Sequence, residues 1–181
     1  PSVRDAARGI AVERGDPAAW AITTSRSIVV PFLTYSDRRD LREQAYRAWK
    51  ARGENDGEHD NRPIAREILK LRTEQARLMG YPSYADFALV DRMAGTPAAV
   101  QQLLHRVWEP AKARAREEHA ALQAQAAAMG QPTTLEPWDW RYYAEKVRQA
   151  RYDVDEAHVK PYFPLERVAE LERTFEHVIC T

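Results

Sequence analysis

Residues 97–129 read PAAVQQLLHRVWEPAKARAREEHAALQAQAAAM. Apolar side chains recur along this stretch at the three- and four-residue spacing of one helix face, or at multiples of it. They are Val100, Leu104, Val107, Ala111, Ala115, Leu122 and Met129. Gly95-Thr96-Pro97 before the stretch and Gly130 after it are typical helix boundaries. The stretch predicts one long helix with a kink or a break at Pro110, because proline removes a backbone hydrogen bond.

Shorter helical patterns flank this long helix. They cover residues 36–53, 61–80, 83–93 and 137–152. Ser36 and Ser83 are suitable N-caps, Pro63 is tolerated in a first turn, and Gly53 and Gly80 supply stops. Further helical patterns occupy residues 2–8 and, near the other end, Leu165 to Val178. Between 152 and 165, Asp153 and Glu156 have the spacing of a capping box for a short turn.

A single segment, residues 21–33, favours an extended conformation. Ile28-Val29-Val30 are β-branched and Pro31 follows them. One such segment cannot form a sheet alone. We therefore expect an all-α fold, a multi-helix array in which residues 1–181 form a single helical segment with one possible short extended segment near 21–33.

Composition excludes several classes of function. The 27 basic side chains cancel the 27 acidic ones, so no net field attracts nucleic acid or anionic lipid. No apolar run approaches the roughly 20 residues that cross a bilayer. A single cysteine, Cys180, permits no internal disulfide and suits a reducing compartment. We expect a cytoplasmic protein with neither a nucleic-acid nor a membrane partner.

No catalytic constellation is visible. A helical zinc motif needs two histidines four residues apart, so that both rings reach one ion. The closest pair here, His105 and His119, is fourteen residues apart. Adjacent carboxylates such as Glu117 and Glu118 point to different sides of a helix, and Cys180 has no strongly cationic neighbour. We predict that the chain supplies no catalytic residue and no metal ligand.

The most unusual local sequence is aromatic. In residues 138–143, WDWRYY, helical spacing places Trp138 with Tyr142 on one face and Trp140 with Tyr143 on another. Two hypotheses stay open: the segment is buried in the core, or it forms an aromatic wall facing a cleft or a partner. Asp139 would be a poor core residue unless it is paired.

Several segments together resemble the thimet-oligopeptidase family of zinc metallopeptidases, especially its bacterial peptidyl-dipeptidases, with oligopeptidase A as a near relative. The similarity runs from about Trp20 to Val168. The segments that carry it are Tyr35–Glu43, Tyr46–Trp49, Asp60–Asn61, Ile64, Glu67–Arg72, Glu74–Ala76, Leu78–Tyr81, Tyr84–Asp86, Asp91–Ala94, Trp138–Tyr143, Tyr152 and Lys160–Leu165.

The resemblance implies a helical protein in two halves around a channel that admits short peptides. Zinc would lie at its floor, held by a His-Glu-x-x-His helix and a further glutamate. In the family that helix lies well beyond the Pro-Tyr-Phe block, which here is Pro161-Tyr162-Phe163. No position of this sequence matches a zinc ligand or the catalytic base.

We therefore expect scaffold and channel wall cut from a longer zinc peptidase, inactive alone, whose partner is the missing catalytic half. Tyr142, Tyr143 and Tyr162 are candidate channel residues, because a phenol offers an apolar face and a hydrogen bond. Exposed apolar faces, especially near Val178-Ile179, predict self-association. Two alternatives stay open: a stand-alone helical interaction module that uses the Trp138–Tyr143 patch, and a remnant homologue that regulates a peptidase.

Overall fold

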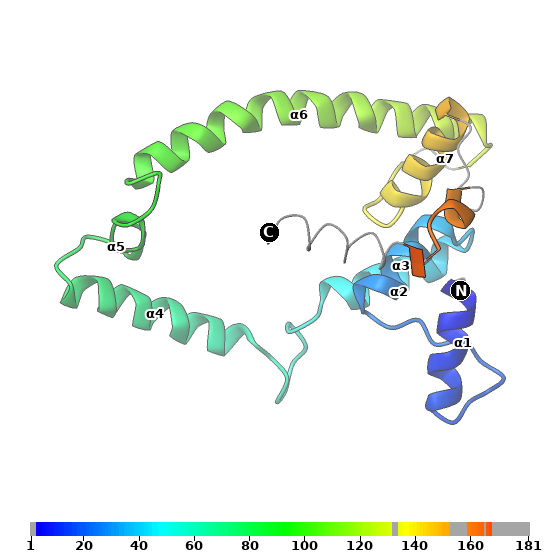
Figure 1. The fold of residues 1–181 in the computed structure, drawn as a ribbon, viewed down its shortest axis with the longest axis horizontal. Coiled ribbons are helices and arrows are strands. Elements are labelled where there is room, and N and C mark those ends of the chain that lie inside the picture. The colour runs from blue at the N-terminus through cyan, green and yellow to red at the C-terminus, as the bar shows by residue number, and fades with distance from the viewer. Residues whose placement is uncertain (1–2, 132–133, 153–158, 165, 168–181) are drawn as a thin grey trace.

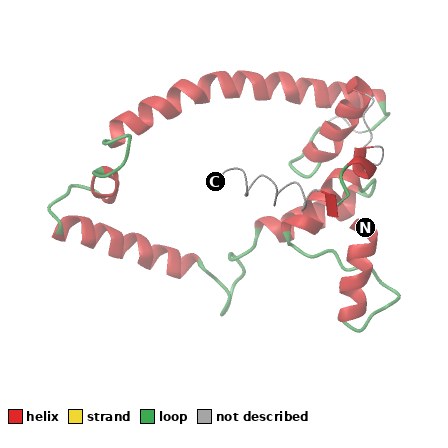
Figure 2. Ribbon diagram, viewed as in Figure 1, coloured by secondary structure: helices red, strands yellow, loops and turns green. Residues whose placement is uncertain are grey.

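The computed structural model describes residues 3–131, 134–152, 159–164 and 166–167. Its helices are α1 (Val3–Glu13), α2 (Arg26–Tyr35), α3 (Arg39–Lys50), α4 (Arg62–Leu78), α5 (Tyr84–Leu89), α6 (Pro97–Ala128) and α7 (Trp140–Tyr152), with a 3-10 turn η1 (Lys160–Tyr162). Figure 2 shows no strand in this described part of the chain. The prediction of an all-α fold is confirmed.

The possible extended segment near 21–33 is wrong for residues 26–33. Residues 26–33 lie in α2, which continues through Pro31 to Tyr35. Ile28, Val29 and Leu33 share the buried face of this helix, and α2 packs against α3 and α7. Burial of that face outweighs the weak preference of β-branched residues for strands.

Helix boundaries agree with the sequence where a side chain caps the helix. The Ser83 hydroxyl accepts a hydrogen bond from the backbone N–H of Asp86, and the Thr96 hydroxyl accepts one from Ala99. Ser36, the expected start of the next helix, instead ends α2, since its N–H donates to the carbonyl of Phe32. That helix, α3, begins at Arg39.

The long helix is present, and it is not broken at proline. α6 runs for 32 residues with Pro110 inside it, and Figure 1 shows it as one gently bowed element. The predicted turn at Asp153–Glu156 and most of the predicted helix at 165–178, including Val178-Ile179, lie outside the described residues.

The helices form a packed end and an open arch (Figure 1). At the packed end α7 lies against α2 and against the C-terminal half of α6, while α1 and α3 pack on α2. Two core clusters meet there: Leu122, Ala126, Tyr142 and Tyr143 between α6 and α7, and Val29, Leu33 and Trp138 beside α2. The arch consists of α4, α5 and the N-terminal half of α6, and α4 makes no close approach to α6.

Candidate functional site

A buried carboxylate joins the N-terminus of α7 to α3. Asp139 directly precedes α7 and is 1% exposed. Arg39 donates to both of its oxygens at 2.8–3.1 Å, and Arg42 donates to Oδ1 at 2.8 Å. Burial acts to raise the pKa of Asp139, but these hydrogen bonds outweigh it and hold that pKa below its ordinary value. The sequence indicated that Asp139 could be a core residue only if it were paired, and it is paired here with Arg39 and Arg42.

The two arginines were not identified from the sequence as functional residues. Arg42 is 2% exposed, and it also donates to the backbone carbonyl of Ser36 at 2.7 Å. Its guanidinium lies 4.2 Å from the centre of the Tyr142 ring, within range of a cation–π contact. This cluster fixes where α7, and therefore its outer face, stands relative to α3.

The three tyrosines named as channel candidates have different surroundings. Tyr142 is buried and its hydroxyl donates to Asp37 at 2.8 Å; burial and then this carboxylate raise its pKa to about 12. Tyr143 is also buried, and burial raises its pKa. Tyr162, on η1, is 79% exposed. Their contact with a channel stays a prediction.

The aromatic segment divides between the core and the surface. Trp138 is buried beside Tyr46 and beneath the guanidinium of Arg47, which lies 5.0 Å from its ring. Trp138, Tyr142 and Tyr143 therefore follow the core hypothesis. Trp140 is 36% exposed and faces outward beside His119, with the two ring centres 6.0 Å apart.

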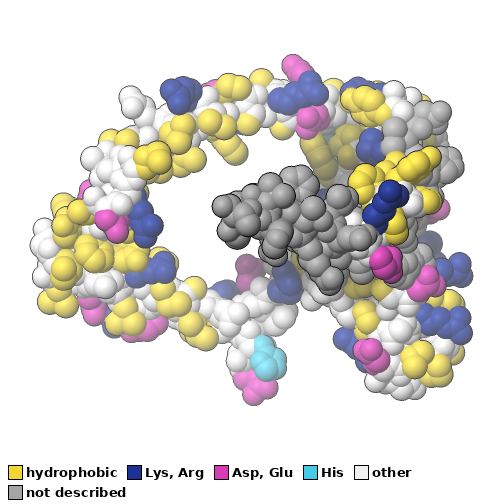
Figure 3. Space-filling model, viewed as in Figure 1, with side chains coloured by type: hydrophobic (Ala, Val, Ile, Leu, Met, Phe, Trp, Pro, Cys, Tyr) yellow, Lys and Arg dark blue, Asp and Glu magenta, His cyan; other side chains and the backbone are white. Residues whose placement is uncertain are grey.

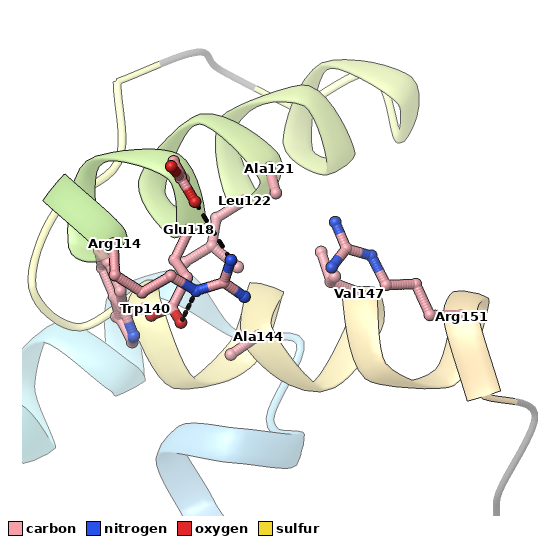
Figure 4. A pocket seen from close by; sticks show the side chains of 9 residues that line it. Arg114, Glu118, Ala121, Leu122, Trp140, Ala144, Val147 and Arg151 are labelled. Atoms are coloured by element: carbon pink, nitrogen blue, oxygen red, sulfur yellow. Dashed lines mark hydrogen bonds and ion pairs between the residues drawn. The ribbon is translucent and has the colours of Figure 1, made fainter. Parts of the chain in front are cut away.

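Trp140 lies between two hollows on the outer side of α6 and α7. One, of about 390 Å³, is lined by His119, Leu135, Glu136, Pro137 and Trp140. The other, which we call the α6–α7 groove, has a volume of about 360 Å³ and is shown in Figure 4. It is lined by Arg114, Glu117, Glu118, Ala121 and Leu122 of α6 and by Trp140, Ala144, Val147 and Arg151 of α7.

Ion pairs occupy only one end of this groove. Arg114 donates to Glu117 and to Glu118, both at 3.1 Å, and Figure 4 shows this cluster at one end with Val147 and Arg151 at the other. The four lining residues of α7 are spaced four, three and four apart, as one helix face requires. That spacing is the sequence signal that could have located the groove.

The arch carries a second unusual surface, which we call the inner apolar face. Its exposed large apolar side chains are Ile64, Ile68, Leu71 and Leu78 of α4 and Leu103, Leu104, Val107 and Trp108 of α6. Figure 3 shows hydrophobic side chains along the inner edge of the arch on both helices. An exposed apolar surface of this extent marks an interaction site.

The match to a known family covers most of the chain. The sequence profile of Peptidase family M3 matches residues 32–179. The chain belongs to peptidase family M3. This membership confirms the resemblance drawn from the segments between Tyr35 and Leu165. The matched range contains α3 to α7 in full.

Curated M3 relatives are similar over nearly all of the chain but are much longer. Dipeptidyl carboxypeptidase of Escherichia coli K12 is 35% identical over 156 residues, which are 86% of this chain and 23% of that protein. Oligopeptidase A of Salmonella typhimurium LT2 is 36% identical over 84% of this chain and 23% of its own length. A probable cytosolic oligopeptidase A of Arabidopsis thaliana is 32% identical over 90% of this chain and 23% of its own length. The chain spans about a quarter of the length of these relatives.

Zinc, which the family resemblance implies, does not fit the side chains seen here. No group of three or more His, Cys, Asp or Glu side chains converges in the described ranges. His105 and His119 both lie on α6, about 21 Å apart along its axis at 1.5 Å per residue, whereas zinc ligands lie within about 2.1 Å of the ion. His158, His177 and Cys180 lie outside the described residues.

None of the helices in the described part combines the length and the apolar composition that crossing a bilayer requires.

Proposed function

We propose that this chain forms a scaffold and channel-wall portion of a zinc-dependent M3 peptidase, an oligopeptidase or peptidyl-dipeptidase that hydrolyses short peptides. Support comes from membership of the family and from relatives named dipeptidyl carboxypeptidase and oligopeptidase A. A cytoplasmic location is part of the proposal, and the relative named as cytosolic supports it.

The inner apolar face is the structural observation that carries this proposal. Leu71 and Leu104 belong to stripes on helices that do not approach each other closely, so neither stripe covers the other. Burying such side chains stabilises a protein by roughly 25 cal/mol per Å² of apolar area. We propose that the covering surface comes from the catalytic half of the peptidase, which also holds the zinc and the catalytic base.

Within this proposal the three tyrosines have two roles. Tyr162, which is largely exposed, is the candidate for direct contact with peptide. Tyr142 and Tyr143 lie beneath the surface, so their burial supports positioning of α7 within the wall. We expect the chain alone to bind no zinc and to cleave no peptide, and the lack of a converging group of metal-ligand side chains among the described residues supports this part of the proposal.

A chimera tests the proposal. In Escherichia coli dipeptidyl carboxypeptidase, the segment that matches this chain would be replaced by residues 1–181. We expect the purified chimera to hold one zinc and to release dipeptides from a short peptide, with activity lost on chelation. A folded, zinc-loaded chimera that cleaves nothing would contradict the wall function. The isolated chain serves as control, and zinc binding with peptide cleavage by it would refute the proposed division of labour.

A stand-alone interaction module is the second candidate. It would have used the Trp138–Tyr143 patch, but burial of Trp138, Tyr142 and Tyr143 leaves Trp140 as the exposed ring of that segment. Only the surface around Trp140 therefore favours this alternative. A chimera that fails while the isolated chain captures a partner through Trp140 would favour it.

A further inference from the structure

One arginine that lines the α6–α7 groove forms no ion pair with the described residues. Arg114 at one end is held by Glu117 and Glu118. Arg151 at the other end lines the groove and has no carboxylate partner among the residues that the structure describes. A guanidinium beside an apolar surface binds a carboxylate strongly, since its planar donors match both oxygens.

The charges also orient an anion within the groove. Glu117 and Glu118 repel a carboxylate from the end near Arg114, and they neutralise that arginine by accepting hydrogen bonds from its Nε and Nη1. Arg151 attracts one at the opposite end. The charges of the two glutamates and two arginines sum to zero. The groove therefore distinguishes ligands by where their charge lies and not by their net charge.

An apolar surface connects the two ends. Leu122 of α6 and Ala144 and Val147 of α7 form its lining, with the half-exposed Trp140 beside them. The volume of about 360 Å³ is small for a binding site and suits one or two amino-acid residues. The ligand must therefore carry an apolar group and a carboxylate close together.

We propose that the α6–α7 groove binds the C-terminal residue of a short peptide, with its α-carboxylate at Arg151 and its apolar side chain on Leu122, Ala144 and Val147. A C-terminal residue carries both groups on one Cα atom, whereas an acidic residue would need its neighbour to supply the apolar group. The ligand class rests on the proposed function. The site itself is separate from hydrolysis, which that proposal assigns to the catalytic half.

Titration of the isolated chain tests the site without any cleavage. N-acetyl-alanyl-leucine would be added to labelled protein while the indole N–H resonance of Trp140, identified with Trp140→Phe, is followed by NMR. The C-terminal amide of the same peptide is the matched ligand control. We expect the free acid to bind about tenfold more tightly than the amide, as for loss of a charged hydrogen bond.

Two variants separate the role of Arg151 from a general charge effect. Arg151→Gln should weaken binding of the acid about tenfold and leave the amide unchanged. Arg141→Gln removes the same charge from an exposed position of α7 outside the groove, and it should change neither. Equal affinity for acid and amide, or an Arg151→Gln variant that binds the acid normally, would overturn the proposal.

A third ligand tests the choice of a C-terminus. N-acetyl-aspartyl-leucinamide carries its only carboxylate on a side chain. If it binds as tightly as the free acid, assignment to a peptide C-terminus is wrong; a tenfold weaker affinity supports it. Because the titration measures no cleavage, its failure and the failure of the peptidase chimera are separate results.

Discussion

Asp139 and Arg42 form a buried ion pair, with Oδ1 of the aspartate 2.8 Å from Nη2 of the arginine and side-chain exposures of 1% and 2%. The two residues are 97 positions apart in the chain, and the pair connects α3 to the start of α7. α7 carries the exposed Trp140 and the buried Tyr142 on different faces. The Asp139–Arg42 ion pair therefore helps to position both aromatic side chains.

Removal of the Asp139 charge should destabilise the packed end strongly. Asp139→Asn leaves the guanidinium of Arg42 buried without its carboxylate, which costs about 3 kcal/mol in comparable sites. Urea unfolding followed by circular dichroism measures the change in free energy. Asp40→Asn, which removes a carboxylate from the exposed pair with Arg38, is the matched control and should leave the midpoint unchanged. An Asp139→Asn protein as stable as the control would show that the pair does not hold α7.

The same carboxylate predicts a loss of stability in acid. The pKa of Asp139 is lower in the folded chain than its ordinary value of 3.8, so the folded state binds the proton more weakly than the unfolded state. Its contribution is therefore complete above pH 3.8 and is lost as the pH falls through the lower folded-state pKa. Unfolding free energies measured across this range should fall less steeply in Asp139→Asn than in the natural sequence, and identical slopes would contradict the assignment.

Helix boundaries were predictable where their causes are local. Ser83 and Thr96 cap α5 and α6 by accepting hydrogen bonds from backbone N–H groups three residues away. The local sequence around these two residues therefore predicts where both helices begin. The error at residues 26–33 has a non-local cause. Ile28 and Val29 favour strands by propensity, but their burial in α2 depends on helices that the segment itself does not encode.

The candidate sites show the same limit. Sequence reasoning required a partner for Asp139, but could not choose Arg39 and Arg42 among 27 basic residues, because the pairing depends on where α3 lies relative to the turn before α7. Helical spacing grouped the four aromatic side chains of residues 138–143 in pairs. Trp138 and Tyr142 are both buried, but Trp140 is exposed while Tyr143 is buried, so only the first pair has a common environment.

Tyr142 should titrate as an unusually weak acid. Burial and the nearby Asp37 raise its pKa to about 12 from 10. Because the unfolded chain ionises this phenol first, stability should fall as the pH rises from about 10 to 12. Spectrophotometric titration should show a phenol that ionises near pH 12, which is absent in Tyr142→Phe and retained in Tyr162→Phe. Replacement by phenylalanine also leaves Asp37 without this donor, at a cost of about 1 kcal/mol.

The inner apolar face should make the isolated chain self-associate. Leu71 of α4 and Leu104 of α6 are both more than half exposed on this face, and water contact with such a surface favours association. Sedimentation velocity over a range of protein concentrations should show a rising mean mass for the natural sequence. Leu71→Glu combined with Leu104→Glu should abolish that rise, because each buried charge in the contact would be unpaired.

The control for this experiment lies on the same helix. Leu69 is at least as exposed as Leu71. It lies on the opposite side of α4, because two residues at 100° per residue turn the helix by about 200°. Leu69→Glu should therefore leave association unchanged. A natural chain that stays monomeric at high concentration would remove the reason for a covering partner. Equal effects of Leu69→Glu and Leu71→Glu would show that association depends on general hydrophobicity and not on the face between α4 and α6.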